Sequence, residues 1–298
     1  MIDSKYLTFI EVCETKNFTA ASKNLGLTQP AVSQHIKQIE EEFGVKLFYR
    51  SNKGLMPTNA GNILLKYAQK IEALENDLKR KIADSKKGST NLTIGITHTS
   101  ESTMAPEILA NYSSQKSGTH IKIISDSIRN LYDKLLNFQI DLAIIEGKVN
   151  NSKFSSVLLN TDSLVAVISN DSPLSKKKVV SLDDLKKERI ILRNFDSGTT
   201  TLFISSLDKL DMSLDDFNVY LELDNVATIK DLVKKNLGVS ILPKNACYEE
   251  LKEKSLVVLP IENMNMIREI NLVYINGNVE REILEDIVTI YREKVNSY

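Results

Sequence analysis

Polar side chains suited to hydrogen bonding lie together on one side of a predicted helix over residues 29–43. At 3.6 residues per turn, Pro30, Ser33, Gln34 and Lys37 fall within an arc of about 100°. The apolar residues of this segment form a separate stripe: Val32, Ile36, Ile39 and Phe43. Hydroxyl and amide groups match the edges of nucleotide bases, and a cation matches phosphate. The polar face therefore predicts nucleic-acid recognition, with an ordinary solvated helix face as the alternative.

Two shorter helices precede this segment and must position it. The first is expected over 4–16, and Gly26 supplies the turn that ends the second. Leu27 is expected to fill the core, while Gln29 and Pro30 begin the third helix, where a missing N–H costs little. Hydroxyl residues are expected to cap the three helices in turn: Ser4, Thr19 and Thr28. Two helices joined by a tight turn, the second polar on one side, are the sequence form of a helix-turn-helix.

A basic hairpin is predicted directly after these helices, in the segment VKLFYRSNKGLMP. Ser51 to Gly54 give a turn signal between two short extended pieces. Arg50 and Lys53 are the cations of this wing, and we expect them to contact phosphate or the minor groove.

A long helix is predicted from Thr58, its expected N-cap, to about Ala83. Its apolar residues alternate in steps of 3 and 4, which is typical of a seam against another helix: Leu64, Tyr67, Ile71, Leu74 and Leu78. The stretch from Asn76 to Lys87 is so charged that the helix must project from its own domain. We therefore expect it to pair with a second copy of the chain, the alternative being packing onto its own domain.

Charge is divided unevenly along the 298 residues. Residues 1–87 hold 14 Lys and Arg against 10 Asp and Glu, a net of +4, and the remainder holds 24 against 29, a net of −5. A basic head on an acidic body fits nucleic-acid contact at one end. No apolar run approaches the ~20 residues needed to cross a bilayer, so no membrane contact is expected. The start of the chain lacks a secretory pattern, which favours a cytoplasmic protein with buried free thiols at Cys13 and Cys247.

Beyond a linker at 86–90, strand-like and helix-like segments alternate, which predicts α/β lobes. Strands are expected at 92–96, 121–125, 141–146, 164–169, 189–193, 256–260 and 271–276. Helices are expected at 104–114, 128–138 and 279–295.

Two hydroxyl-rich loops in this region each follow a strand and precede a helix, one at 97–100 (Thr-His-Thr-Ser) and one at 197–200 (Ser-Gly-Thr-Thr). Hydroxyls and N–H groups at a helix start favour a carboxylate, sulfate or phosphate. Ligands of open α/β sheets also bind outside the carboxyl ends of strands. Ordinary N-capping is the alternative for either loop. Arg193, at a strand end, is a candidate anion clamp, with a surface ion pair as its alternative.

The chain resembles the LysR-type transcriptional regulators. The resemblance runs through FTAASKNLGLTQPAVSQHIKQIEEEFGVKLFYR and on into PTNAG, a long and specific motif. It implies an α/β fold with an all-α N-terminal head, in which a two-lobed effector domain resembles periplasmic binding proteins. The implied parts are a winged helix-turn-helix (1–57), a linker helix for dimerisation (58–87) and the effector domain (88–298), with lobe I at about 90–161 and 268–298 and lobe II at about 162–267.

The resemblance also implies which residues bind. Those expected to contact DNA are Thr28, Gln29, Pro30, Ser33, Gln34, Lys37, Arg50 and Lys53. Those expected to contact a small effector between the lobes are Thr97, His98, Thr99, Ser100, Glu101, Ile128, Ser197, Gly198, Thr199, Val226 and Thr228. The chain departs from the family at Ser100 and Glu101, where many members have Ile and Gly, and at Ile128, where Ser is frequent. Glu101 would oppose an anion, so a cationic or zwitterionic effector is favoured.

These patterns predict a sequence-specific DNA-binding transcription regulator whose activity is modulated by a small metabolite. The expected partners are double-stranded DNA and further copies of the chain, as a dimer through the linker helix and then a homotetramer; RNA polymerase is a candidate partner. No catalytic residue, metal site or cofactor is predicted, because the sequence has no HExxH, Walker loop or GxGxxG after a strand. Two alternatives stay open: a constitutive regulator with an empty cleft, and a solute-binding or enzymatic α/β protein with an incidental helical head.

Overall fold

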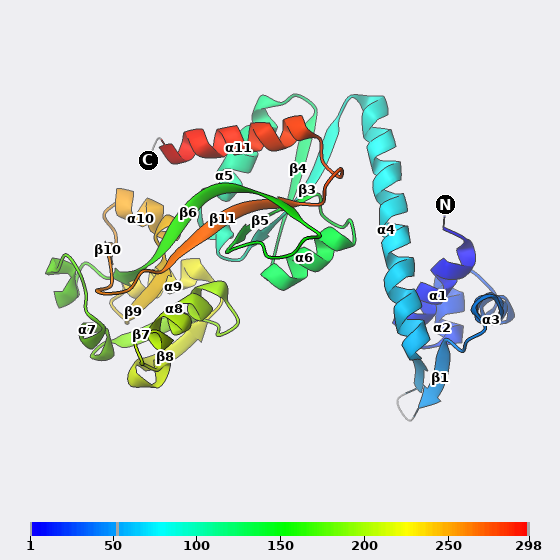
Figure 1. The fold of residues 1–298 in the computed structure, drawn as a ribbon, viewed down its shortest axis with the longest axis horizontal. Helices are drawn as coiled ribbons and strands as arrows, with labels where there is room; N and C mark the ends of the chain where they lie inside the picture. The colour runs from blue at the N-terminus through cyan, green and yellow to red at the C-terminus, as the bar shows by residue number, and fades with distance from the viewer. Residues whose placement is uncertain (1, 52–53, 297–298) are drawn as a thin grey trace. The chain divides into compact units, whose positions relative to one another are not determined.

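The structure is a computed structural model that describes residues 2–51 and 54–296. The chain folds into two compact units (Figure 1). The first comprises Met1–Gly88 with Leu136–Gln139, and the second comprises Ser89–Leu135 with Ile140–Tyr298.

The first unit is a helical head with a hairpin wing. Its elements are α1 (Ser4–Thr15), α2 (Phe18–Leu25), α3 (Gln29–Phe43), β1 (Phe48–Ser51), β2 (Gly54–Pro57) and α4 (Asn59–Lys87). The strands β1 and β2 pair antiparallel, as the wing prediction required. The side chains buried between the helices and the start of the wing are Phe9, Val12, Cys13, Ala21, Val32, Ile36, Ile39 and Leu47. The apolar stripe of α3 thus holds the polar face outward.

Two of the predicted helix caps were wrong. Asp3 caps α1, where its side chain accepts the N–H of Lys5, and Asn17 caps α2, where it accepts the N–H groups of Thr19 and Ala20. The caps expected at Ser4 and Thr19 therefore lie inside or beside the first turn, because a better acceptor precedes each of them. Leu27 was expected in the core but is 39% exposed, and Phe43, at the end of the α3 stripe, is 52% exposed.

The close start of α4 against the head depends on a glycine. A Cβ at Gly61 would lie 2.3 Å from the carbonyl oxygen of Leu47. The same oxygen accepts the N–H of Thr58 at 2.8 Å. Thr58 caps α4 as predicted: its Oγ1 accepts the N–H of Gly61 at 3.0 Å and donates to the carbonyl of Lys46 at 2.7 Å. These contacts fix the beginning of α4 on the strand that leads into the wing.

The second unit is built on a mixed sheet with the strand order β4-β3-β5-β11-β6-β9-β7-β8, with β10 also paired to β6. The strands are β3 (Thr90–Thr97), β4 (Thr119–Asp126), β5 (Leu142–Glu146), β6 (Ser155–Ile168), β7 (Arg189–Arg193), β8 (Asn218–Leu223), β9 (Val239–Pro243), β10 (Val257–Leu259) and β11 (Ile267–Tyr274). The strand β3 pairs parallel with β4 and β5, and β7 pairs parallel with β8 and β9.

Two lobes share this sheet, and the long strand β6 belongs to both. Its first part pairs with β11 up to Ser163, and the part from Leu164 onward pairs with β9 and β10. Figure 1 shows β6 and β11 side by side between the lobes. Lobe I carries the helices α5 (Ala105–Gln115), α6 (Ile128–Leu136) and α11 (Arg281–Asn296), and lobe II carries α7 (Leu182–Lys186), α8 (Gly198–Asp208), α9 (Val226–Lys234) and α10 (Tyr248–Lys252). Short 3-10 turns are η1 (Ser100–Ser102), η2 (Pro173–Lys176), η3 (Leu214–Asp216) and η4 (Lys244–Cys247).

Each lobe has its own apolar core. In lobe I, the sheet residues Ile94, Ile144 and Leu272 pack with Leu109 of α5 and Tyr291 of α11. In lobe II, one cluster forms around Phe203 of α8, and a second forms between the sheet and α9. Both cysteines are free and buried, as predicted. Within residues 2–51 and 54–296, no helix is long and apolar enough to cross a membrane.

Candidate functional site

The polar face of α3 is open to solvent in the first unit. Gln34 and Lys37 are exposed, and Ser33 is half-buried. The other residues expected on this face, Thr28, Gln29 and Pro30, are also exposed. Thr28 caps α3 by accepting the N–H of Ala31, and Pro30 lies in the first turn, as predicted. The Nε2 of Gln29 donates to the Oγ of Ser33 at 3.0 Å, so two candidate base-reading groups already hold one another in place.

The wing brings a second set of cations beside this helix. A hollow of about 380 Å³ lies between α3 and the wing, and its lining includes three cations, Lys37, Lys46 and Arg50, with one acid, Glu40. Arg50 is exposed on β1, where it pairs with Leu55. Lys53 lies outside the described residues. Since a phosphate group attracts several cations at once, this hollow is suited to the DNA backbone.

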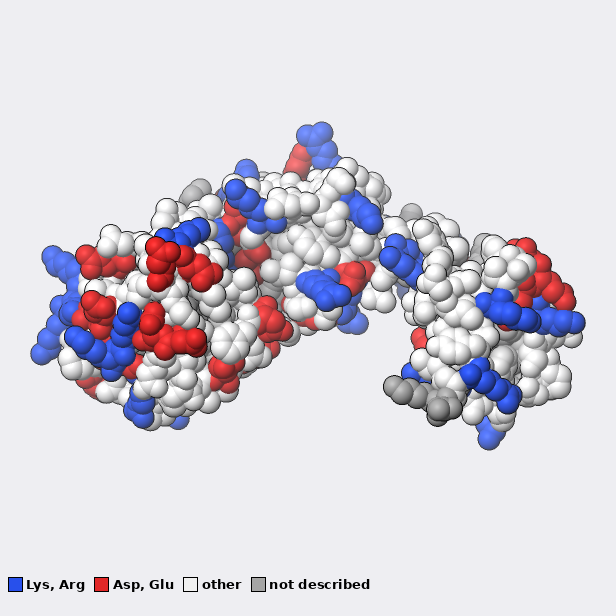
Figure 2. Space-filling model, turned by 60° about the horizontal axis from the view of Figure 1, so that its bottom comes forward, with Lys and Arg blue, Asp and Glu red and all other residues white. Residues whose placement is uncertain are grey.

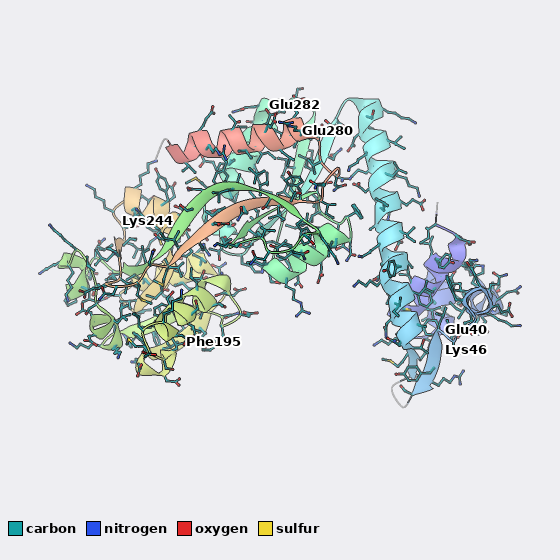
Figure 3. The ribbon with its side chains drawn as sticks, in the orientation of Figure 1. Glu40, Lys46, Phe195, Lys244, Glu280 and Glu282 are labelled. Atoms are coloured by element: carbon teal, nitrogen blue, oxygen red, sulfur yellow. The ribbon has the colours of Figure 1, made fainter. Side chains whose placement is uncertain are left out.

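Glu40 ties the recognition helix to the wing. Its carboxylate accepts the N–H of Leu47 at 2.9 Å and lies 2.5 Å from the Nζ of Lys46 (Figure 3). Sequence reasoning did not single out Lys46, which is a cation between the helix end and the first wing strand. Its spacing of six residues from Glu40 has no helical regularity, so no periodic signal marked it.

His35 points away from the candidate DNA face. Its Nδ1 lies 2.8 Å from the Oγ1 of Thr8, which binds α3 to α1. Lys37 forms an exposed ion pair with Glu41 at 3.4 Å. Because exposed pairs of this kind contribute little stability, the Lys37 ammonium can exchange a carboxylate for a phosphate.

In the second unit, the first hydroxyl-rich loop is bonded to a buried acid. The Thr97 hydroxyl lies 2.7 and 2.9 Å from the two carboxylate oxygens of Glu146, and the Ser100 hydroxyl donates to Glu146 at 2.8 Å. Thr97 ends β3 and Glu146 ends β5, so the carboxyl ends of these two parallel neighbours bring them together. Both hydroxyls were expected to contact an effector, and in the structure both bond to Glu146.

Thr99 connects the lobes. Its Oγ1 accepts the Nη1 hydrogen of Arg193 at 2.5 Å, and Arg193 comes from β7 in lobe II. Arg193 is 4% exposed and also forms an ion pair with Asp224, whose backbone carbonyl accepts its Nε–H at 3.1 Å. The alternatives for Arg193 were an anion clamp and a surface ion pair. The structure shows the ion pair, with Asp224, together with a buried interlobe contact to Thr99 that neither alternative described.

The remaining residues of that loop pair locally. His98 Nδ1 lies 3.6 Å from a carboxylate oxygen of Glu101, and Glu101 is exposed.

The second hydroxyl-rich loop caps α8 at the boundary between the lobes. Ser197 Oγ accepts the N–H of Thr200 at 3.2 Å. A Cβ placed at Gly198 would lie 3.8 Å from the Cδ1 of Ile128, which begins α6 in lobe I. Ile128 and Gly198, both expected at the cleft, are therefore brought together. Thr199 is 1% exposed, and its Oγ1 has no hydrogen-bond partner among the described residues.

The two candidates on α9 lie elsewhere. Val226, expected at the border of the cleft, is buried in the core of lobe II with Val165 and Ile191. An apolar side chain at the first turn of α9 gains more from that core than from an aqueous cleft. Thr228 is exposed, and its backbone and hydroxyl both donate to Asn225, which caps the helix.

A hollow of about 380 Å³ lies where the lobes meet the crossing strand β11. Its lining includes Gly198 and Leu202 of α8, with four charged residues that the sequence reasoning missed: Glu146, Lys148, Arg268 and Glu269. The available signal was a charge at one end of an otherwise apolar strand: Glu146 at the end of LAIIE, and Arg268 and Glu269 near the start of IREINLVY.

Arg268 is buried with incomplete hydrogen bonding. It is 8% exposed, and its Nη2 lies 3.5 Å from Asp162 and 3.9 Å from Glu146. Its Nε has no hydrogen-bond partner in the part of the chain that the structure describes. Burial raises the pKa of Asp162, and the charge of Arg268 opposes that shift. One buried cation therefore faces two buried acids at distances longer than a charge-assisted hydrogen bond.

Comparison with known proteins places both units in one family. The model of the bacterial regulatory helix-turn-helix protein, lysR family, matches residues 5–62, and the LysR substrate binding domain matches residues 85–296. The chain belongs to the LysR family. The resemblance seen in the sequence is therefore confirmed, as are the winged head and the two-lobed α/β domain. This LysR-type chain is a DNA-binding transcription regulator with an effector-binding domain.

Named relatives extend over most of the chain. It is 27% identical over 271 residues to a probable RuBisCO transcriptional regulator of Thalassiosira pseudonana, covering 89% of this chain and 88% of that one. It is 29% identical over 273 residues to an uncharacterized HTH-type transcriptional regulator of Methanocaldococcus jannaschii, covering 91% of each.

Solved structures share its fold. The LysR family regulator CbnR, full-length and complexed with its target DNA, has a TM-score of 0.71 at 17% identity and covers 98% of this chain and 99% of that one. The effector-binding domain of QuiR in complex with shikimate has a TM-score of 0.56 at 20% identity, covering 70% of this chain and 99% of that domain.

Proposed function

We propose that this regulator reads its operator with the exposed face of α3 and holds the DNA backbone with the wing. The proposed contacts are Thr28, Gln29, Pro30, Ser33, Gln34 and Lys37 on the helix, and Arg50 and Lys53 on the wing. The observation that carries the proposal is the hollow where Lys37 of α3 and Arg50 of β1 line one surface. Figure 2 shows acidic and basic side chains interspersed on the visible face of lobe II, which offers no field of one sign to a polyanion.

Fluorescence anisotropy on the DNA upstream of the gene tests these contacts. Replacing Lys37→Ala should weaken binding to all sequences and reduce the salt slope by about 1, because one phosphate contact is lost. Replacing Gln34→Ala should instead relax the preference for the operator over unrelated DNA. Lys66→Ala and Gln69→Ala are matched controls, since both residues are exposed on α4 outside this face. If the α3 variants bind like their controls, the proposed reading face is wrong.

The proposal includes pairing of two chains through α4. The helix exposes a long apolar face that the rest of its own unit leaves uncovered: Ile63, Tyr67, Ile71, Leu74, Leu78 and Ile82. A hollow of about 500 Å³ continues this face between the head and α4, with Tyr6, Phe43 and Val45 in its lining. Exposed contiguous apolar surface of this kind marks an interface. Pairing would present two heads to two half-sites.

Sedimentation velocity tests the pairing. The double variant Ile71→Lys and Leu74→Lys should lose the α4 contact and sediment at half the wild-type mass, whether the wild type is a dimer or the proposed homotetramer. The double variant Lys66→Glu and Gln69→Glu changes the charge of α4 outside the apolar face and should keep the wild-type mass. An unchanged mass for the first variant would exclude α4 as the interface.

We further propose that a small effector occupies the hollow beside Arg268 and alters DNA binding by favouring one angle between the lobes. Its lining by groups from both lobes and from β11 supports this role, as does the incomplete bonding of Arg268. Three hydroxyls would act indirectly: those of Thr97 and Ser100 hold Glu146, and that of Thr99 holds Arg193. The ligand itself would be bordered by Ile128 and Gly198. Calorimetry with a metabolite library separates this function from a constitutive regulator, for which no compound would bind.

Since its partner is DNA, we place the regulator in the cytoplasm, and activation of a promoter would bring it into contact with RNA polymerase.

A further inference from the structure

The charged groups around the interlobe hollow restrict the chemistry of its ligand. This inference rests on the proposed effector function of that hollow. The lining carries two acids, Glu146 and Glu269, and two cations, Lys148 and Arg268. We propose that the ligand is a small zwitterion of the amino-acid type, with its carboxylate at Arg268 and the start of α8 and its ammonium at Glu146.

Arg268 supplies unused hydrogen-bond donors. A guanidinium carries five N–H groups, and charge-assisted bonds to oxygen are about 2.7–2.9 Å long. The contacts of Arg268 with Asp162 and Glu146, at 3.5 and 3.9 Å, exceed that length, and its buried Nε bonds to no group in the described ranges 2–51 and 54–296. A carboxylate has the planar pair of oxygens that such donors bind.

The beginning of α8 adds a second attraction for an anion. This helix spans eleven residues, and Gly198, its first residue, lines the hollow without a side chain. The first N–H groups of a helix have no intrahelical partner, and the capping Ser197 accepts only that of Thr200. Lys148, exposed beside the hollow, contributes a further positive charge.

Glu146 supplies unused acceptor capacity. A carboxylate has about four acceptor positions, whereas each hydroxyl donates a single hydrogen. Thr97 and Ser100 therefore satisfy only about two of those positions, although three oxygen–oxygen contacts lie at 2.7–2.9 Å. An ammonium group carries three donors and a positive charge, which match the remaining positions.

The charge balance of the buried cluster favours a zwitterion over a simple anion. Glu146 and Asp162 are 8% and 5% exposed, and Arg268 is the cation that faces both. A carboxylate alone would add a third negative charge to this buried set, whose one buried cation is Arg268, and only the exposed Lys148 would offset it. A zwitterion brings its own compensating cation, so the cluster can accept it. The hollow of about 380 Å³ is near the lower end of the range for ligand pockets, which fits a compact ligand.

Isothermal titration calorimetry of the full-length protein tests the proposal. The probes are the twenty amino acids and, for each one that binds, the matching carboxylate without its amine and the matching amine without its carboxylate. At least one amino acid should bind, and each single-charge analogue should bind at least tenfold more weakly.

The variant Glu146→Gln keeps the size of the side chain and an acceptor for Thr97 and Ser100, but removes the charge. It should weaken binding of the amino acid at least tenfold and leave the affinity of the carboxylate analogue unchanged or higher. Glu107→Gln is the control, because Glu107 is an exposed acid of lobe I that pairs with Lys294 and does not line the hollow. The control variant should bind the amino acid with the affinity of the wild type, and circular dichroism checks the fold of both variants.

The outcomes separate this inference from the function on which it rests. If metabolites bind but the carboxylate analogues bind as tightly as the amino acids, the hollow is an effector site and the zwitterion is wrong. If no compound of the metabolite library binds, both the effector function and its ligand class are overturned. Equal loss in Glu146→Gln and Glu107→Gln would also contradict the proposed role of Glu146.

Discussion

The hydrogen bond between Thr99 and Arg193 should measurably stabilise the second unit. Thr99→Val keeps the shape of the side chain and replaces the hydroxyl by a methyl group. The Nη1 hydrogen of Arg193, which Thr99 accepts at 2.5 Å in the wild type, would then face a methyl group. Arg193 is only 4% exposed, so water cannot readily replace the lost acceptor. Leaving a buried donor without its acceptor costs ~1–3 kcal/mol. With ~2 kcal/mol lost, a unit of this size should melt about 4–8 °C lower.

The assay is thermal and urea unfolding followed by circular dichroism. Thr228→Val is the matched control, because that hydroxyl bonds to Asn225 on the surface, and its loss should change stability by less than ~0.5 kcal/mol. A double-mutant cycle then isolates the contact. In an Arg193→Met background, Thr99→Val should cost almost nothing, which would give a coupling of ~1–2 kcal/mol.

Two results would refute the reasoning. An unchanged melting temperature for Thr99→Val would mean that the contact contributes no net stability. The same cost in wild-type and Arg193→Met backgrounds would mean that Thr99 acts through something other than Arg193.

Three further predictions concern other parts of the chain. Gly61→Ala should destabilise the first unit by ~1–2 kcal/mol in urea unfolding, because the clash with the Leu47 carbonyl exceeds the helix propensity gained; Asn62→Ala, on the exposed side, should not. The hydrogen bond from Lys134 lowers the pKa of Asp126 to about 2. The free energy of unfolding should therefore be larger in the wild type than in Asp126→Asn at pH 7, and this difference should disappear as the pH falls from about 4 to about 2. Burial raises the pKa of the Cys13 and Cys247 thiols to about 12. A disulfide reagent at pH 8 should therefore react with these two cysteines only after the protein is denatured.

The sequence predicted the elements well because their signals are local. The stripe of Val32, Ile36 and Ile39 lies within one helix, and all three are buried in the head. The caps at Thr28 and Thr58 were found because a hydroxyl directly precedes each helix. The same local rule failed at Ser4 and Thr19, where a neighbouring Asp or Asn offers the stronger acceptor.

The cleft was predicted less well because its contacts join residues far apart in the sequence. Thr99 and Arg193 are separated by 94 positions, and Thr97 and Glu146 by 49. No periodicity links such pairs, so the sequence indicated hydroxyls near a cleft without the groups that they hold. Arg268 is the extreme case, since it faces Asp162 across 106 positions through the pairing of β6 with β11.

These contacts give a physical reason for two departures of this chain from its family. Ser100 stands where the resemblance implies that many members have Ile, and its hydroxyl donates to Glu146. An Ile at position 100 would leave Thr97 as the remaining hydroxyl donor to the buried Glu146 carboxylate. The charge of Glu146 would then have fewer hydrogen bonds, which is unfavourable in a buried position. Ile128, where the resemblance implies a frequent Ser, lies against Gly198, which lines the hollow. The hydroxyl of Ser100 thus supports the buried charge of Glu146 at one part of the hollow, while Gly198 leaves the start of α8 without a side chain at another.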